Sequence, residues 1–404
     1  MQDDFFDWLK EGGSEFDDIF FEEYDNERGV HSNKNIKKNS LVIKIPRKMI
    51  IHSNRPSKNS TLMEKLDIPN KNIHKLVLFM LEDMESGESF FQPYYDILPD
   101  DLSHFPIFWT EEELLFLENS HFIDDIINRR ETFYNNYKKL STLPDFSYTF
   151  DDYCIIRTLV GSRNFGLNIN GERVIAMVPL GDMFNHDIPA DVKWSFDNSL
   201  ESYTMRANHS IKKGHQISDS YGKKCNSKYL LYYGFMVGDN DINCKTLVDL
   251  QYNKDIDKLS NLREPLIQAN QKYLLDSNWE SNNKLLSQLR IINADLGELK
   301  YIINKYSDSS IIPPISKKNE MKTLESFFEI LKKEKDNYGS SIDENKLELN
   351  RNENPNKKTA LQMIIREKEN IKYFEKNLEK LLKNLLFETP DINMQKYLNI
   401  IKNL

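Results

Sequence analysis

Cysteine is scarce in this sequence, and its three residues, Cys154, Cys225 and Cys244, lie far apart. Their odd number and wide spacing exclude a disulfide framework and a paired-cysteine metal motif. No run of about 18 apolar residues is present, and the acidic start lacks the basic and apolar regions of a signal peptide. We therefore expect a cytoplasmic or nuclear protein that does not enter a membrane.

Positive charge is also in short supply, because 63 acidic residues outnumber 54 basic ones and give a formal net charge of −9. A general nucleic-acid binder needs a basic surface that displaces counterions from phosphates, so this function class is excluded. The 23 Phe and 19 Tyr residues favour a packed globular core over disorder.

Several common catalytic motifs are missing. The eight histidines include no HExxH pair, and neither a GxSxG elbow nor a GxGxxG turn after a strand is found. The nearest phosphate-loop candidate, at 166–171, is followed by Glu172 instead of the lysine that would hold a phosphate. These absences argue against a zinc peptidase, a serine hydrolase and a Rossmann enzyme.

The pattern along the chain predicts two β-rich parts separated by helices. A turn at 28–30 precedes a strand at 41–46, and helical periodicity then dominates from about residue 60 to residue 155. Strand patterns return afterwards and end at turns. The later strands are expected at 174–178, 202–205 and 216–218.

Beyond about residue 255 the pattern predicts helices. Two apolar stripes recur at helical spacing and are expected to lie in a core; they comprise Leu324, Phe327, Phe328 and Leu331, and Ile371, Phe374, Leu378, Leu381, Leu382 and Leu385. The polar segments 307–316 and 340–358 are expected to be exposed loops. The fold class predicted is α+β.

Three short blocks follow one another in the second β-rich part: GSRNF at 161–165, VPLGDMFNH at 178–186, and SDSYG at 218–222 running on through Asn226 to YGF at 233–235. Together they resemble the SET-domain protein methyltransferases, in the subgroup of the Rubisco large-subunit lysine methyltransferase. The segments RGVHSNKNI at 28–36 and SFFQPY at 89–94 are similar to that subgroup too.

The resemblance implies a β-rich SET core split by a helical insert and followed by an all-helical domain similar to the subgroup's substrate-binding domain. The expected boundaries are residues 1–60 and 156–250 for the two parts of the core, 61–155 for the insert, and 255–404 for the helical domain.

The resemblance also implies S-adenosylmethionine as cofactor, no metal, and Tyr221 as the catalytic residue. The residues expected at the cofactor, besides Tyr221, are Arg163, Asp182, Met183, Phe184, Asn185, His186, Tyr233, Gly234, Phe235, Thr61, Leu62 and Met63. A purely structural alternative for Arg163 is an ion pair with a carboxylate such as that of Asp182.

The expected function is transfer of a methyl group to a lysine of another, non-histone protein, by an enzyme that works as a monomer. One branch of the subgroup methylates histidine in actin. It has asparagine and tryptophan where this chain has Phe165 and Gly181, so these two substrate-site positions favour lysine. A third hypothesis is a SET-fold interaction protein that has lost catalysis.

Overall fold

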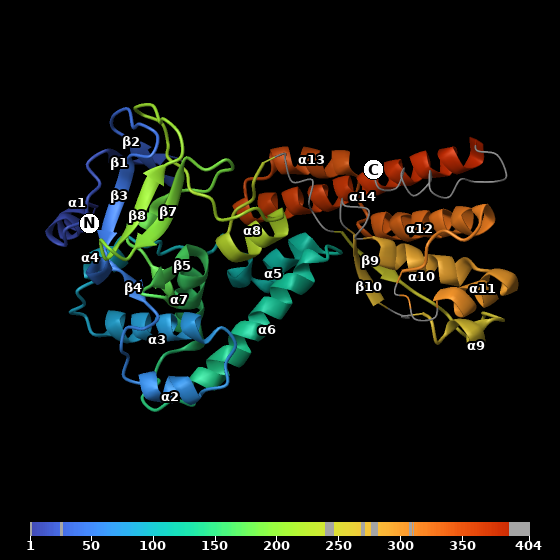
Figure 1. Cartoon of the computed structure of the whole chain (residues 1–404), viewed down its shortest axis with the longest axis horizontal. Helices are drawn as coiled ribbons and strands as arrows, with labels where there is room; N and C mark the ends of the chain where they lie inside the picture. Colours follow the sequence, from blue (N-terminus) through green and yellow to red (C-terminus); the bar gives the residue numbers. More distant parts are fainter. Residues whose placement is uncertain are drawn as a thin grey trace. The chain divides into compact units, whose positions relative to one another are not determined.

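The computed structural model describes residues 2–24, 27–238, 246–267, 271–275, 282–306, 309 and 311–387 (Figure 1). The chain divides into two compact units. The first comprises Met1–Ile107 and Ile127–Lys224, and the second comprises Phe108–Ile126 and Cys225–Leu404. Each unit therefore contains two separate stretches of sequence, and Cys244 lies outside the described residues.

The first unit contains small antiparallel sheets. Strands β1 (Ile19–Tyr24) and β2 (Glu27–Ser32) form a pair, and two three-stranded sheets have the orders β3-β8-β7 and β4-β6-β5. Their strands are β3 (Leu41–Pro46), β7 (Val192–Asp197), β8 (Ser202–Ala207), β4 (Ile51–His52), β5 (Asn164–Ile169) and β6 (Glu172–Met177). Both three-stranded sheets join the start of the chain to residues after 163, which is the split core that the sequence predicts.

Burial alternates along β5, as expected for a strand with one face toward the core. Phe165, Leu167 and Ile169 are buried. At the hairpin between β5 and β6, Asn170 and Gly171 both have positive φ, of 53° and 86°. This Asn-Gly turn matches the twist of the two strands. Residues 166–171, the nearest phosphate-loop candidate in the sequence, are therefore part of a β-hairpin.

The helices of the first unit surround these sheets: α1 (Gln2–Glu11), α2 (Ser60–Lys65), α3 (Lys71–Glu85), α4 (Gln92–Tyr95), α7 (Phe150–Arg163), most of α6 (Phe122–Leu140), and the 3₁₀ helices η1 (Arg47–Met49), η2 (Pro106–Phe108) and η4 (Gly181–Met183). A capping box of Thr149 and Asp152 starts α7. The helix ends at Arg163, and β5 begins at the next residue. Arg163 is thereby fixed between a helix and a strand.

The second unit is mainly helical. It contains α5 (Glu111–Leu114), η3 (Leu115–Leu117), α8 (Asn226–Tyr233), α9 (Ser260–Arg263), α10 (Asn283–Asn293), α11 (Leu296–Tyr306), α12 (Lys317–Asn337), α13 (Ile342–Arg351) and α14 (Pro355–Phe387). The two apolar stripes predicted from the sequence pack against each other within one core, where the rings of Phe327 and Phe374 lie 6.5 Å apart. Both stripes are confirmed as core.

The α+β class and the helical C-terminal part are confirmed, with local differences. Residues 28–30 lie within β2 and are no turn, and 216–218 form no strand beyond an isolated bridge between His31 and Gln216. Strands β9 (Thr246–Leu250) and β10 (Gln271–Leu275) add an antiparallel pair to the second unit. The prediction of an exposed loop at 340–358 is wrong, because a capping box of Ser341 and Glu344 starts α13 there.

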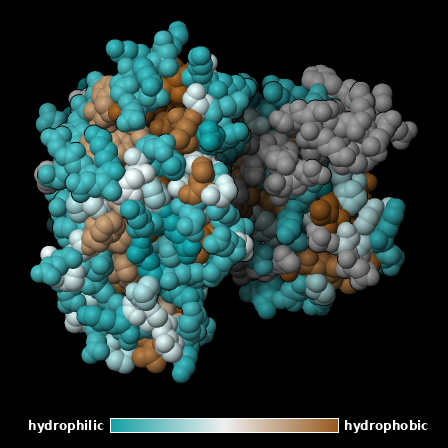
Figure 2. Space-filling model, turned by 60° about the vertical axis from the view of Figure 1, so that its left-hand side comes forward, coloured by the Kyte–Doolittle hydropathy of each residue, from teal (hydrophilic) through white to brown (hydrophobic). Residues whose placement is uncertain are grey.

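The surface agrees with a polar exterior. Figure 2 shows a mostly hydrophilic face on which hydrophobic residues lie in small separate groups. Scattered apolar residues of this kind are normal on a protein surface. Within the described part of the chain, every helix is too short or too polar to cross a membrane.

We predict that the ion pair between Arg290 and Glu320 is critical for the second unit. Two bonds of 2.7 Å join the guanidinium to the carboxylate, and the side chains are 2% and 1% exposed. Glu320→Ala would leave a buried cation unpaired, so urea unfolding should show a loss of about 3–5 kcal/mol. The pair of Lys318 and Asp295, whose side chains are 68% and 52% exposed, is the control, because Lys318→Ala should cost less than about 1 kcal/mol. Equal losses would contradict the prediction.

Candidate active site

Two loop segments of the first unit, 184–187 and 217–221, are joined through their backbones. Asp219 N–H donates to the carbonyl of Asn185 at 2.8 Å, and Asp187 N–H donates to the carbonyl of Asp219 at 3.0 Å. His186 and Asp219 form an isolated parallel bridge. The DMxNH and SYG blocks, more than 30 residues apart in sequence, therefore meet in space.

Tyr221 is fixed at both ends by the other segment. Its N–H donates to Nδ1 of His186 at 3.1 Å, and its hydroxyl donates to the carbonyl of Phe184 at 2.8 Å. The two rings of His186 and Tyr221 stack with centroids 5.1 Å apart. Tyr221 is half-buried, so its hydroxyl is positioned at a partly accessible place.

Asn185 and His186 have separate contacts. The Asn185 side chain donates to the carbonyl of Arg28 at 3.1 Å, which ties this segment to β2. Burial lowers the pKa of His186, against the opposing effects of the Asp219 backbone and the Asp187 charge. The imidazole is thus neutral at pH 7, in keeping with the acceptor role of Nδ1.

Arg163 and Asp182 form the ion pair that the sequence offered as the structural alternative. The guanidinium lies 3.3 Å from the carboxylate and donates to the backbone carbonyl of Asp182 at 3.0 Å. Burial raises the pKa of Asp182, although Arg163 and the hydroxyl of Tyr94, at 2.8 Å, oppose this. The pair does not exclude a cofactor role, because the Arg163 side chain keeps 22% exposure.

Met183 lies between two arginines. Its sulfur is 3.1 Å from Nη2 of Arg28 and 3.7 Å from Nη1 of Arg163. Burial, and then the charge of Arg163, lower the pKa of Arg28. The sequence had placed Arg28 in a turn and in the segment 28–36 that resembles the subgroup, and its role here arises from a contact across 155 residues.

Phe165 and Gly181, the positions expected to decide the target residue, both lie against Tyr203. The Phe165 ring is 5.2 Å from the rings of Tyr203 and Trp194, at steep angles. A Cβ at Gly181 would lie 3.1 Å from Cε1 of Tyr203 and 3.0 Å from Val178. The neighbours of Gly181 leave little space for a larger side chain.

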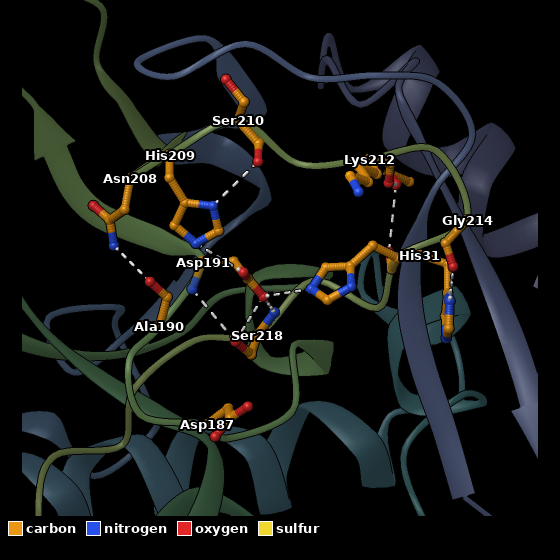
Figure 3. A network of polar contacts seen from close by, with 12 residues as sticks. His31, Asp187, Ala190, Asp191, Asn208, His209, Ser210, Lys212, Gly214 and Ser218 are labelled. Carbon is orange, nitrogen blue, oxygen red and sulfur yellow. Dashed lines mark hydrogen bonds and ion pairs between the residues drawn. The ribbon is translucent and has the colours of Figure 1, made fainter.

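The buried carboxylate of Asp191 supports the segment that leads to Tyr221 (Figure 3). It accepts hydrogen bonds from the N–H and the hydroxyl of Ser218 at 2.9 and 2.8 Å. Nε2 of His209 lies 3.0 Å away and Nε2 of His215 lies 3.5 Å away. No sequence motif predicted this network, because its residues come from three separate segments of the chain.

The other predicted residues belong to other elements of the chain. Thr61, Leu62 and Met63 are in α2, and among the described contacts no hydrogen bond or ring contact joins them to the 182–186 segment. Tyr233, Gly234 and Phe235, at the end of α8, belong to the second unit. Their cofactor role stays a prediction.

The α8 terminus has a defined local structure. Gly234 caps the helix with a φ of 80°, a conformation that favours glycine. Tyr229 stacks on Phe235 with centroids 5.4 Å apart, and the side chain of Asn226 bonds both the N–H and the carbonyl of Val237 at 2.9 Å. Asn226 thus folds the YGF block back onto its own helix.

Metal ligands were not expected from the sequence. Across the described ranges, no group of three or more His, Cys, Asp or Glu side chains is arranged to hold a metal ion.

Comparison with known families identifies two matching models. A SET domain model matches residues 27–222, and a Rubisco LSMT substrate-binding model matches residues 256–369. The first match contains Tyr221 and the 182–186 segment, and the second lies in the second unit.

Relatives with assigned functions match at low identity. An actin-histidine N-methyltransferase of Xenopus tropicalis is 26% identical over 61% of this chain, and its human counterpart is 25% identical over 58%. A ribosomal lysine N-methyltransferase of Schizosaccharomyces pombe is 26% identical over 52%. The matches span only 45%, 42% and 40% of those three proteins.

Solved structures share the fold over almost the whole chain. Rubisco LSMT bound to sinefungin and monomethyllysine matches with a TM-score of 0.76 at 19% identity, covering 98% of this chain and 95% of that one. Rubisco LSMT bound to AdoMet matches with a TM-score of 0.74 at 19% identity, covering 95% and 92%.

We predict that Asp191 is essential for the stability of the Tyr221 segment. Asp191→Ala would leave the buried N–H and hydroxyl of Ser218 without their acceptor, which should cost about 2–4 kcal/mol in urea unfolding. Asp187→Ala is the control, because Asp187 is exposed and bonds only its own neighbour Ile188 through its side chain. A cost below about 1 kcal/mol for Asp191→Ala would refute the role of the network.

Proposed function

Because the chain belongs to the SET-domain family and carries a Rubisco LSMT substrate-binding domain, we propose that it transfers a methyl group from S-adenosylmethionine to a lysine side chain of another protein. The observation that carries the proposal is the position of Tyr221. Its hydroxyl is held at 2.8 Å by the Phe184 carbonyl, next to the segment of Asn185 and His186.

The residues around Met183 fit the cofactor. Arg28 and Arg163 both interact with the buried Asp182, so positive charge is in excess among these groups. A carboxylate such as that of the amino-acid end of S-adenosylmethionine would balance this charge. Asn185 and His186 are half-buried and offer an amide and a neutral imidazole for its other polar groups. When bound, the cofactor supplies a methyl carbon activated by the sulfonium.

Tyr221 would orient the target nitrogen. Methyl transfer is an in-line displacement, so the nucleophile must be aligned with the methyl carbon and the sulfur, and positioning supplies much of the rate. The hydroxyl of Tyr221 donates a hydrogen bond to the carbonyl of Phe184. The lone pairs of the hydroxyl oxygen therefore stay available to accept a hydrogen bond from an N–H of the target amine. The electron-rich face of the tyrosine ring also attracts the positive charge that develops on the target nitrogen.

Two features support lysine as the target. The rings of Phe165 and Trp194 form an apolar wall that suits the aliphatic stem of lysine. Gly181 stands where the histidine branch has tryptophan, and Val178 and Tyr203 leave little space for such a ring. The second candidate is histidine, favoured by the actin-histidine relatives.

We predict that labelled S-adenosylmethionine and a whole-cell protein extract will yield labelled protein with the wild type. Tyr221→Phe should reduce the rate about 100-fold, because the nucleophile loses its alignment. The measurement is radioactivity incorporated per minute. Tyr134→Phe, a change at a half-exposed tyrosine of α6, is the control and should leave the rate unchanged.

Hydrolysis of the labelled protein to amino acids separates the candidates. Methyl-lysine in the hydrolysate would support the proposal. Methyl-histidine would show that the target is histidine, the second candidate. If no protein is labelled while the chain binds S-adenosylmethionine in a calorimeter, a SET-fold interaction protein is favoured. Equal rates for wild type and Tyr221→Phe would contradict the role of the hydroxyl.

A further inference from the structure

Asp219 is a buried acid that the proposed mechanism has not used. It is 4% exposed, and none of the described lysine, arginine or histidine side chains forms an ion pair with it. Burial raises the pKa of its carboxyl to about 6, against only one opposing hydrogen bond, from the N–H of Ser220. Burying a carboxylate without a cation is costly, so its presence calls for a physical reason.

Asp219 lies two residues before Tyr221 on an extended segment. The N–H groups of Ile217, Asp219 and Tyr221 each donate to a neighbouring segment, at 2.7, 2.8 and 3.1 Å. Alternation of this kind is typical of a strand, in which residues i and i+2 point to the same face. If the segment keeps this alternation, which its isolated bridges support, the Asp219 carboxyl lies on the side that also carries the phenol of Tyr221.

A second buried polar group, the hydroxyl of Tyr203, interacts electrostatically with Asp219. Tyr203 is completely buried, and its hydroxyl has no hydrogen-bond partner among the described residues. Burial, and then the charges of Asp219 and Asp182, raise the pKa of Tyr203, so both carboxyls act electrostatically on its hydroxyl. Asp182 already bonds Arg163 and Tyr94, whereas Asp219 has no such partner.

Tyr203 adjoins the residues that favour lysine. The ring of Tyr203 contacts Phe165 and the position of Gly181, and it stacks with Trp194 at 6.1 Å. A buried carboxylate and a free hydroxyl beside apolar rings match a ligand with an aliphatic stem and a cationic, hydrogen-bonding end.

We propose that Asp219 and Tyr203 receive the target side chain: the Asp219 carboxylate binds the lysine ammonium and takes its proton, and the Tyr203 hydroxyl makes a second hydrogen bond to the nitrogen. This inference rests on the proposed function and deepens it, because it selects a protonated amine as substrate and adds a catalytic residue to Tyr221.

The proton balance is simple. The ammonium gives one proton to the carboxylate, which becomes a neutral carboxylic acid, and the amine keeps its lone pair. The nitrogen lone pair forms the new bond to the methyl carbon, while the bond between the methyl carbon and sulfur breaks and leaves its electrons on sulfur. The methylated nitrogen then carries the positive charge, and the proton on Asp219 leaves to water.

The surroundings of Asp219 favour such an exchange. The titratable groups around it are Tyr203 from β8, Asp182 from η4, and the half-buried His186 on the joined segment, whose imidazole is neutral. Lys224, three residues after Tyr221, bonds the Tyr221 carbonyl and forms no ion pair with Asp219. An incoming ammonium would therefore be the first cation in contact with the carboxylate.

The test is the pH profile of methyl transfer to whole-cell protein extract by the wild type and by Asp219→Asn. The wild-type rate should be level above pH 7 and fall tenfold per unit below about pH 6, where Asp219 becomes protonated. The asparagine variant should be about 100-fold slower at pH 7 and rise with pH up to 9, since it depends on the free amine in solution. Asp100→Asn, the same change at an exposed aspartate outside the two joined segments, should keep the wild-type profile.

Stability gives a readout that is independent of activity. An acid whose pKa is higher in the folded protein than in the unfolded chain stabilises the fold fully below the unfolded value of about 4, and this contribution is lost as pH rises through about 6. The Tm of Asp219→Asn should therefore exceed that of the wild type at pH 7.5, and the excess should vanish at pH 4. The variant is thus expected to fold.

Tyr203→Phe tests the second group. It removes only the hydroxyl, so its Tm should equal or exceed the wild-type value while the KM for protein rises about fivefold. If the wild type labels protein and Asp219→Asn has the same rate and the same pH profile as the wild type, this inference is overturned while the proposed function stands. A wild type that labels no protein overturns the proposed function and this inference with it.

Discussion

The candidate site depends on the hydrogen bonds by which residues 217–221 are joined to residues 184–187. The bond from Asp219 N–H to the Asn185 carbonyl and the bond from Tyr221 N–H to His186 set the relative position of the two segments. Neither segment belongs to a regular sheet, so this position is not fixed by a strand ladder. Asp191 supplies part of the missing support from outside, because its carboxylate holds Ser218. The reactive geometry of the site thus relies on a few bonds, each from a different part of the chain.

The buried acids near this site differ in how their charge is compensated. Asp182 has an arginine and a tyrosine hydroxyl, and Asp191 has a serine and two histidines. Asp219 has the Ser220 N–H alone. A carboxylate with full compensation holds the fold together, whereas one without a cation is ready to bind one. The contrast separates acids that support the structure from the acid available for chemistry.

Local patterns in the sequence were sufficient to predict much of the fold. The β-type runs of β3, β6 and β8 and the helical stripes of α12 and α14 depend on neighbouring residues, and the structure contains all of them. The capping box of Ser341 and Glu344 was equally local, so α13 could have been predicted. The pairing of β9 with β10 joins residues more than 20 positions apart, whereas 28–30 pair with residues 21–23 of β1, close by in sequence. Propensity alone does not decide such pairings.

The site was predictable to the extent that its residues share short motifs. The blocks with Asn185, His186 and Tyr221 pointed to segments that the structure joins. Trp194 and Tyr203 carried no motif. Arg28 and Tyr94 lay in segments that resemble the subgroup, but those segments did not reveal their contacts with Met183 and Asp182, which cross 155 and 88 residues of sequence. Asp219 was inside a recognised block, yet only burial distinguishes it from an ordinary exposed aspartate.

The discontinuous second unit has a consequence for synthesis of the chain. Trp109, Leu114, Leu117 and Phe122 pack with Leu230, Leu231, Ala360 and Met363 in one apolar cluster. A ribosome makes the first four of these residues more than 200 residues before it makes the helix that carries the last two. The nascent chain therefore exposes an unfinished apolar surface for most of its translation, at roughly 5–20 residues per second. Chaperones that shield such surfaces should matter more for this protein than for one whose domains are each continuous in sequence.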